Sequence, residues 1–379
     1  MLLLWQTNPS TAGLSFEAPL NDAGAGIVNT TPLSSIGPAT ASFARNSTAY
    51  TRLSSGVWAL VLANQPRSMY SAAGIYLGYW YELARANVLG GTNAIVRTMS
   101  DVGWVVGATL TVGTAVGVDG VAGSCALLTG GAVAATNTIL FTTVLASAAR
   151  TYSIRVRRVT GTSPVNITDN GGTNWTAMAT TATEQLFQVT RTQANPVVGV
   201  QVEGLGDQVA VDFNTIEAAT FANPSPIPVG VSKLSDVLGY DAANVGSTQG
   251  TVYCECTTLA PSGSFSPFVG NNSGSGGSLL HIRASDNKFA IYDGTNETAF
   301  GSAISVPTST VQRAASAWGD SSMGGSSNGS AVTSGTFDNN MSMTTLGIGW
   351  YNASGFGSAK NVRVWQNKKS AAELVALTS

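Results

Sequence analysis

The chain has 379 residues, of which 44% are hydrophobic and only 10% are charged, and its formal net charge at pH 7 is −2. The apolar fraction is too high for a disordered chain, and the charge balance lacks the basic excess of nucleic-acid-binding proteins. We therefore expect a folded protein of two or three domains that does not bind nucleic acid.

Residues 1–90 have the least regular pattern in the chain. Short extended pieces at 41–45 and 57–61 lie between turn-rich stretches. Residues 74–81 are dense in aromatic side chains and are predicted to be buried, either within the domain or at a subunit contact. Because the region lacks periodicity and a core of its own, we expect it to dock onto a larger assembly or to be shared between subunits.

Residues 91–222 alternate apolar and small residues with a period of two, and Gly, Asn and Asp turns separate the alternating segments. Segments such as 152–159, 197–202 and 208–213 predict strands, and no segment has the length and pattern of a helix. The spacing of these strands predicts a β-sandwich or a jelly roll.

A proline-rich linker is predicted at 223–239, because three prolines fall within the five positions 224–228. Proline removes a donor from a strand ladder and enforces an extended path, so we place a domain boundary there. The segment 231–238 within the linker is predicted to form a short helix or an edge strand.

Residues 240–379 show sharper strand signals. Clean alternation in 250–257 places Cys254 and Cys256 on one face of a strand, where they are too far apart for a disulfide and are predicted to be buried. A turn at 285–287 predicts a hairpin. The helical signal of this region comes at its end, at 370–377.

Residues 1–5 are apolar but lack the basic start and the length of a signal peptide, and no window has the uninterrupted apolar length of a membrane span. Three cysteines and one histidine support neither a disulfide framework nor a zinc site. We expect a protein made in the cytoplasm without a targeting segment, membrane span, cofactor or metal.

Catalytic constellations are not evident in the sequence. His281 is predicted to be a half-exposed strand residue without a nucleophile to serve. The acidic pairs Glu203/Asp207 and Asp293/Glu297 lie in glycine-bearing turns, whereas a glycosidase needs two carboxylates facing across a cleft. We therefore predict no catalytic residue and no enzyme activity.

Other charged and polar residues are interpreted as structural or solvated. Asp286, Asp293 and Asn296 could bind calcium, but they lack a calcium-loop spacing and are interpreted as turn residues. Arg155 and Arg157 fall on one face of a strand, which we interpret as a solvated face.

Trp350, Tyr351 and Asn352 are the candidate carbohydrate-binding residues. They stand at a predicted strand end, and sugars stack on exposed aromatic faces that are flanked by amides. The alternative, which the pattern favours, is a core tryptophan with a tyrosine at the rim.

The strand order of residues 240–379 resembles the laminin-G-like, or concanavalin-like, jelly roll. The resemblance is carried by the closing stretch 362–378, in which an apolar strand ending in Trp365 is followed by an Ala-Glu-Leu helix. Asn328, Gly329 and Ser330 stand where that family has an Asn-Gly hairpin. The resemblance implies a β-sandwich that the C-terminal helix caps.

Two upstream motifs resemble a pair found in tailed-phage virion proteins. Residues 41–50 are similar to the motif AxFTRASTATYV, and residues 79–89 are similar to the motif GLLIEEARTNLL that follows it. Leu83 replaces one acid of the second motif and Ala86 replaces its threonine. In those proteins the motifs precede a carbohydrate-binding-module-like sandwich, and a laminin-G-like domain ends the chain.

The expected fold is all-β, with two β-sandwich or jelly-roll domains (91–222 and 240–379) after an irregular N-terminal region. The resemblance implies a structural protein on the virion surface, either a head fibre or a capsid decoration. Its partners would be other capsid or tail proteins, with a homotrimer preferred and surface glycans as further candidates. A tail-fibre carbohydrate-binding adhesin and a polysaccharide depolymerase are the alternatives.

Overall fold

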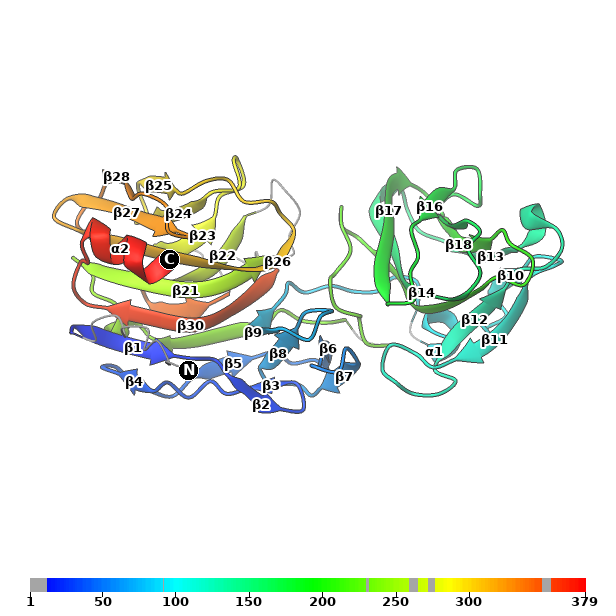
Figure 1. Ribbon diagram of the computed structural model, residues 1–379, viewed down its shortest axis with the longest axis horizontal. Coiled ribbons are helices and arrows are strands. Elements are labelled where there is room, and N and C mark those ends of the chain that lie inside the picture. Colours follow the sequence, from blue (N-terminus) through cyan, green and yellow to red (C-terminus); the bar gives the residue numbers. More distant parts are fainter. Residues whose placement is uncertain (1–11, 91, 230–231, 259–264, 272–276, 350–355) are drawn as a thin grey trace, which may run out of the picture.

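The computed structural model describes residues 12–90, 92–229, 232–258, 265–271, 277–349 and 356–379. Two β-sandwiches lie side by side along the long axis of the molecule (Figure 1). One is built from both ends of the chain and is called the terminal sandwich. The other is formed by the middle of the chain and is called the inserted sandwich.

The larger sheet of the terminal sandwich has the strand order β2-β3-β8-β9-β30-β21-β26-β27-β28, and β1 pairs with β30 and with β4. Its strands are β1 (Leu14–Ala18), β2 (Asp22–Gly24), β3 (Ile27–Val28), β4 (Ser34–Ser35), β8 (Arg67–Tyr70), β9 (Tyr76–Tyr81), β21 (Gly250–Thr258), β26 (Thr308–Gly319), β27 (Ser322–Ser327), β28 (Thr333–Thr336) and β30 (Gly357–Trp365).

The second sheet of the terminal sandwich has the order β25-β24-β23-β22-β29-β20-β5. Its strands are β5 (Ser42–Ala44), β20 (Val237–Asp241), β22 (Ser266–Asn271), β23 (Ser278–Ile282), β24 (Phe289–Tyr292), β25 (Glu297–Phe300) and β29 (Thr345–Ile348). The hairpin predicted around 285–287 is confirmed, because β23 pairs antiparallel with β24.

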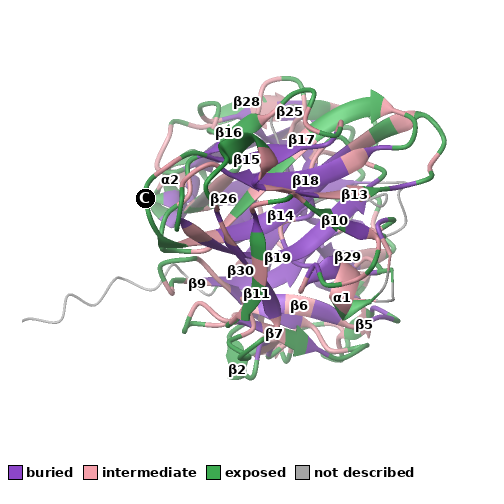
Figure 2. Ribbon diagram, turned by 90° about the vertical axis from the view of Figure 1, so that its right-hand side faces the viewer, coloured by how far each residue is buried: buried purple, intermediate pink, exposed green. Residues whose placement is uncertain are grey.

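The inserted sandwich consists of two five-stranded sheets, with the orders β10-β13-β18-β15-β16 and β11-β12-β19-β14-β17. Its strands are β10 (Trp104–Val106), β11 (Thr111–Ala115), β12 (Cys125–Thr129), β13 (Thr138–Thr142), β14 (Ala148–Thr160), β15 (Val165–Thr168), β16 (Thr176–Met178), β17 (Gln185–Gln193), β18 (Val197–Val202) and β19 (Gln208–Glu217). Figure 2 shows β14, β18 and β19 largely buried and β11 largely exposed.

The remaining elements are short. They are the hairpin of β6 (Ala49–Arg52) and β7 (Trp58–Val61), the helices α1 (Asn93–Val96) and α2 (Ala371–Thr378), and the 3₁₀ turns η1 (Ala134–Thr136) and η2 (Ala242–Asn244). None of the helices in the described part of the chain is long and apolar enough to span a membrane.

The cores confirm the alternation that the sequence predicts. On β21 the side chains of Val252, Cys254 and Cys256 point into the core of the terminal sandwich, whereas Glu255 lies on the outer face. Both thiols are free and buried. The all-β fold class is therefore correct, with a separate apolar core in each sandwich.

The structure corrects the expected N-terminal region, because strands β1–β5, β8 and β9, all within residues 14–81, belong to the two sheets of the terminal sandwich. One edge of β30 pairs with β9 through residues 357–359 and with β1 through residues 362–365, and β5 pairs with β20. The expectation of an irregular region without a core is wrong for these residues. Local pattern cannot reveal pairings between strands some 300 residues apart in sequence.

The segment 221–228 also differs from the exposed linker that its prolines predict. Most of it is buried between the sandwiches, and Phe221 contacts Phe356 with ring centroids 5.1 Å apart. Strand β20 begins at Val237, inside the predicted linker, but it lies between β29 and β5 in the sheet, so the described part of 231–238 forms neither the predicted helix nor an edge strand. Prolines here shape a buried connection, which composition alone does not distinguish from a free one.

The C-terminal helix α2 forms where the sequence predicts it, because Ser370 and Glu373 make a complete capping box. The Ser370 hydroxyl accepts from the Glu373 backbone N–H, and the Glu373 carboxylate accepts from the Ser370 backbone N–H at 2.8 Å. Leu374 and Leu377 pack over Tyr253, Ala315 and Trp365. The helix therefore covers one end of the outer face of the larger sheet.

A fully buried ion cluster holds the N-terminal strands to the rest of the molecule. It contains Arg45, Arg67, Glu82, Lys233 and Asp236. Arg45 Nη1 donates to Asp236 Oδ1 at 2.7 Å, and Arg67 Nη2 donates to Glu82 Oε2 at 2.9 Å. Arg45 and Glu82 belong to the two motifs at 41–50 and 79–89, so these motifs meet in one structural contact.

Three cations face two anions in this cluster. Burial would raise the pKa values of Asp236 and Glu82, but the neighbouring cations overcome it and hold both below their ordinary values. Burial lowers the pKa of Lys233 to about 8, and repulsion from Arg67 and Arg45 adds to this. Lys233 is therefore the member of the cluster that most readily releases its proton.

We predict that Asp236→Asn lowers the free energy of unfolding by about 3–5 kcal/mol, because it removes the counter-charge of Arg45 and leaves three buried cations facing the single carboxylate of Glu82. Urea denaturation followed by tryptophan fluorescence measures the loss. The matched control is Asp320→Asn at an exposed position, which should change stability by less than about 0.5 kcal/mol. Equal effects of the two substitutions would contradict the structural role of the cluster.

A second prediction concerns Glu217 at the end of β19, where burial raises the pKa to about 7 from the ordinary value of 4.5. The folded protein then binds more protons than the unfolded chain between these values, so stability falls as pH rises through this range. The shift corresponds to about 3 kcal/mol. We expect Glu217→Gln to be more stable than the wild type at pH 7.5, and the gain to vanish at pH 4.5.

Urea midpoints of both proteins across this pH range provide the measurement. Lys233 titrates above the range, so it does not mask the effect. A difference between the two proteins that does not change with pH would show that the Glu217 carboxyl has the same pKa in the folded and unfolded states.

Candidate functional site

The predicted carbohydrate-binding residues Trp350, Tyr351 and Asn352 fall in the stretch 350–355, outside the described residues. The prediction made for them stays a prediction. Two hollows elsewhere on the described surface bring together side chains that the sequence did not group.

The first hollow, here called the cleft, lies between the two sandwiches and has a volume of about 260 Å³. The terminal sandwich contributes residues from β6, β7, β8 and β9, and the inserted sandwich contributes residues from β14 and the start of β17. The side chains that define it chemically are Arg52, Trp58, Tyr70, Trp80, Arg155 and Glu184.

Glu184 links the two sides of the cleft by hydrogen bonds to both. Its Oε2 accepts from Arg52 of the terminal sandwich, and its Oε1 accepts from Arg155 of its own sandwich. Burial would raise the pKa of this carboxyl, but the charges of Arg155 and Arg52 overcome burial and lower it. Glu184 is therefore ionised at neutral pH, and the three groups leave one net positive charge in the cleft.

Aromatic side chains form the wall of the cleft. The guanidinium carbons of Arg155 and Arg52 lie 4.3 Å and 4.9 Å from the centre of the Trp58 ring, within cation–π range. Trp80 is buried behind them, whereas Tyr70 is half-buried and stands against Tyr76 with ring centroids 5.2 Å apart. Among the described residues that line the cleft, Tyr70 is thus the aromatic residue that is not buried.

Two buried donors beside the cleft have no hydrogen-bond partner among the described residues. They are Arg52 Nε and Trp80 Nε1. An unsatisfied buried donor costs free energy, and such groups are found at sites where a ligand or water completes the hydrogen bonding. The Tyr70 hydroxyl, in contrast, donates to Asp22 Oδ2 at 3.0 Å at the exposed rim.

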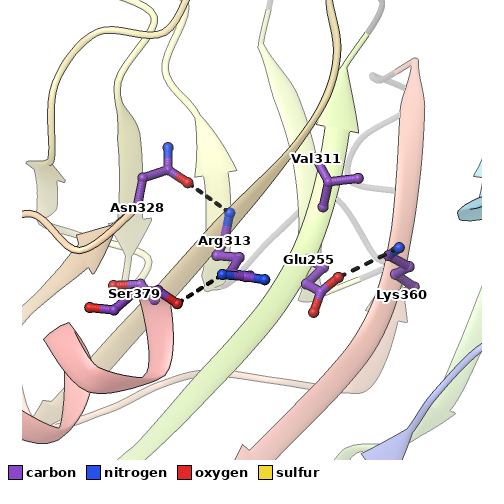
Figure 3. Close-up of a pocket in the computed structure, with 7 residues that line it drawn as sticks. Glu255, Val311, Arg313, Asn328, Lys360 and Ser379 are labelled. Atoms are coloured by element: carbon purple, nitrogen blue, oxygen red, sulfur yellow. Dashed lines mark hydrogen bonds and ion pairs between the residues drawn. The ribbon is translucent and has the colours of Figure 1, made fainter. Parts of the chain in front are cut away.

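The second hollow, here called the groove, is an open depression of about 440 Å³ on the outer face of the larger sheet. Figure 3 shows Glu255 of β21 between Lys360 of β30 and Arg313 of β26. Glu255 Oε2 lies 3.6 Å from Lys360 Nζ, and Arg313 Nη1 donates to the Ser379 carbonyl oxygen at 2.8 Å. The groove is lined by charged and amide groups, with Val311 as its apolar member.

Val311 connects the two hollows. It lines the groove and also packs against the cluster of Trp58, Met69, Leu77 and Trp80 beside the cleft. The cleft and the groove therefore lie next to each other on one face of the same sheet.

His281 is placed differently from the prediction, because it is fully buried rather than half-exposed. Its ring packs against Phe265 at 4.8 Å, and its Nε2 lies 3.0 Å from Glu297 Oε1. Burial lowers the pKa of His281, although Glu297 opposes the shift. Both faces of β23 are covered, which the alternation of a single strand does not show.

Arg155 is likewise not on a solvated face. It is 4% exposed and donates both to Glu184 and to the Pro224 carbonyl oxygen. Arg157 is closer to the prediction, since it is half-exposed and donates to the Val116 carbonyl oxygen. The partners of Arg155 come from residues that follow it by about 30 and 70 positions, and no local motif links them.

The acidic residues considered in the sequence are engaged in local structure. Asp293 accepts from the backbone N–H groups of Thr295, Asn296 and Asp338, and Asp286 pairs with Arg283. The described residues contain no group of three or more His, Cys, Asp or Glu side chains that could hold a metal ion.

The acidic pair Glu203/Asp207 also bonds to neighbours rather than facing across a hollow. Glu203 accepts from Asn166 at 2.7 Å, and Asp207 accepts from the Ser163 backbone N–H at 2.7 Å. Neither residue lines the cleft or the groove.

No protein-family model matches the sequence, and no curated protein sequence matches it significantly. Domain 4 of AbnA, an extracellular arabinanase from Geobacillus stearothermophilus solved with arabinotriose, aligns with 38% of this chain and 73% of its own, at 14% identity and a TM-score of 0.33. The CBM40 of the Ruminococcus gnavus IT-sialidase, solved with sialyllactose, aligns with 38% of this chain and 93% of its own, at 15% identity and a TM-score of 0.31.

A tandem of CBM22 domains from Paenibacillus barcinonensis Xyn10C aligns with 78% of this chain and 94% of its own, at 10% identity and a TM-score of 0.25. Similarity at this level carries no argument about what the present chain binds.

Proposed function

We propose that this chain is a glycan-binding protein without catalytic activity, and that the cleft between the sandwiches is its binding site. The observation that carries the proposal is the joint presence of aromatic rings and charged hydrogen-bonding groups in one solvent-connected hollow. Sugars have apolar ring faces that pack on aromatic side chains and hydroxyl groups that need donors and acceptors. Tyr70 meets the first requirement, and Arg52, Arg155 and Glu184 meet the second.

The dimensions of the cleft suit a small ligand unit. Sites for drug-sized ligands occupy about 300–1,000 Å³, and the cleft, at about 260 Å³, lies just below that range. A single sugar ring is smaller than a drug-sized molecule. The net positive charge further favours glycans that carry carboxylate groups.

The lack of catalysis is part of the proposal. Glycoside hydrolysis ordinarily uses two carboxylates that flank the scissile bond. Among the described residues that line each hollow, the cleft has one acidic side chain, Glu184, and the groove has one, Glu255. The Glu184 carboxylate is moreover held by two arginines, which keep it ionised and unsuited to act as a general acid.

We further propose that the protein is displayed on the surface of a tailed-phage virion, as a head fibre or capsid decoration, after synthesis in the host cytoplasm. The proposal rests on the paired motifs at 41–50 and 79–89 and on their order relative to the two sandwiches. That Arg45 and Glu82 of these motifs meet in one buried cluster supports treating them as parts of one structural unit. Its partners would be other virion proteins, and the preferred assembly is a homotrimer.

Immunogold electron microscopy of phage particles tests the proposed location. Label on the head supports the decoration role, and label on the tail would instead indicate an adhesin of the tail fibre. Particles without label would contradict the virion proposal. Release of reducing ends from a polysaccharide by the purified protein would contradict the non-catalytic proposal and indicate a depolymerase.

For the binding site, we predict that Tyr70→Ala weakens glycan binding at least about tenfold, equivalent to about 1.4 kcal/mol, because it removes the accessible aromatic face of the cleft. Binding is measured by titration calorimetry against the best ligand from a panel of dextran, alginate, polygalacturonate and chitin fragments. Tyr70 is half-buried at the rim, so the fold should persist.

The matched control is Tyr292→Ala, which removes a half-buried tyrosine from the opposite sheet, where its hydroxyl donates to Gly294. Wild-type affinity is expected for this variant. If Tyr70→Ala binds as tightly as the wild type, the cleft is not the site.

A further inference from the structure

We propose that the groove is a second subsite for the glycan held in the cleft, so that the ligand is an oligosaccharide extended across the outer face of the larger sheet. This inference rests on the proposed function. It assigns a ligand-binding role to Glu255, Arg313 and Lys360. The cleft by itself gives these three residues no role.

Strand register places the groove one row away from a buried row that begins at Trp80 beside the cleft. Trp80 pairs with Ser358, and Ser358 pairs with Thr257, so these three residues form one row across β9, β30 and β21. Lys360, Glu255 and Arg313 form the next row on the same face, two residues further along the strands. Two residues of a strand span about 7 Å, so the rows lie within reach of one extended ligand.

The groups in the groove suit hydroxyl-rich ligands. Arg313 is exposed, and its Nη1 donates a hydrogen bond to Ser379. Glu255 is held in place by the Tyr253 hydroxyl at 3.2 Å and by Asn361 Nδ2 at 3.0 Å, in addition to Lys360. A positioned carboxylate between two cations offers both acceptors and charged donors to a sugar chain.

Helix α2 sets the far limit of the site. The row beyond Glu255 contains Tyr253, over which Leu374 and Leu377 of α2 pack. The Glu255 row therefore lies between two buried rows, those of Trp80 and Tyr253, which are four residues apart along the strands, or about 14 Å. A ligand longer than this meets the helix, which Figure 3 shows beside Ser379 at the edge of the groove.

The test is a chain-length series. Oligosaccharides of one to six units are prepared from whichever of dextran, alginate, polygalacturonate or chitin binds best, and each is titrated into the full chain. We expect wild-type affinity to rise with length until the ligand spans the face, and to be constant thereafter. Tyr70→Ala should weaken binding of all lengths alike, because every ligand uses the cleft.

Arg313→Ala should remove the gain that longer ligands show, by about tenfold at the plateau, and leave the affinity for the monosaccharide unchanged. Glu255→Gln should likewise remove the increase in affinity with ligand length. It serves as a second variant if Arg313→Ala disturbs the sheet. The control is Arg191→Ala, which removes a 41% exposed arginine side chain from the inserted sandwich and should reproduce the wild-type series.

Two results would overturn the inference while leaving the proposed function intact. The first is a wild-type affinity that does not depend on ligand length. The second is a pair of groove variants that both keep the full gain with length. If the wild type binds none of the four polysaccharides or their fragments, the proposed function fails, and the inference fails with it.

Discussion

Burial of charge is the constraint on which the rest of this structure depends. Arg67, Asp236 and Glu82 are fully buried, and each would be strongly destabilising without its partners. The partners come from three separate parts of the chain, so the cluster forms only when the N-terminal strands β8 and β9 lie against the segment that leads into β20. The charges thereby select one arrangement of the two ends of the chain.

This arrangement also positions the cleft. β9 carries Glu82 immediately after its last residue and carries Trp80 on its outer face, while β8 runs from Arg67 to Tyr70. The inserted sandwich is tied to the same point, because Ser225 at its exit donates from its backbone N–H to Glu82 at 3.0 Å. The ion cluster thus fixes the wall on which Tyr70 and Trp80 stand, and Glu184 closes the cleft from the other side.

Sequence reasoning succeeded where the signal was local. Alternation located the strands around Cys254 and Cys256, and the Ser370–Glu373 spacing located α2 through its capping box. It failed where the partner was distant. Nothing near Arg155 in the sequence indicates that it contacts Glu184 and Trp58. The many aromatic residues in 74–81 predicted burial, but they did not show which ring borders a hollow. The site depends on contacts between two sandwiches, which no single strand encodes.

The scarcity of charge makes the exposed charged groups informative. Only 10% of the residues are charged, and many of them are used in buried pairs such as Arg45 with Asp236. The surface is therefore made mostly of hydroxyl, amide and small apolar groups, which contact sugars with little specificity. A surface of this composition distinguishes one ligand from another mainly where a charged side chain is exposed to solvent next to an aromatic side chain or an open face of a sheet. Along the outer face of the larger sheet, the cleft and the groove are two such places, and their adjacency makes an extended glycan the ligand that would use both.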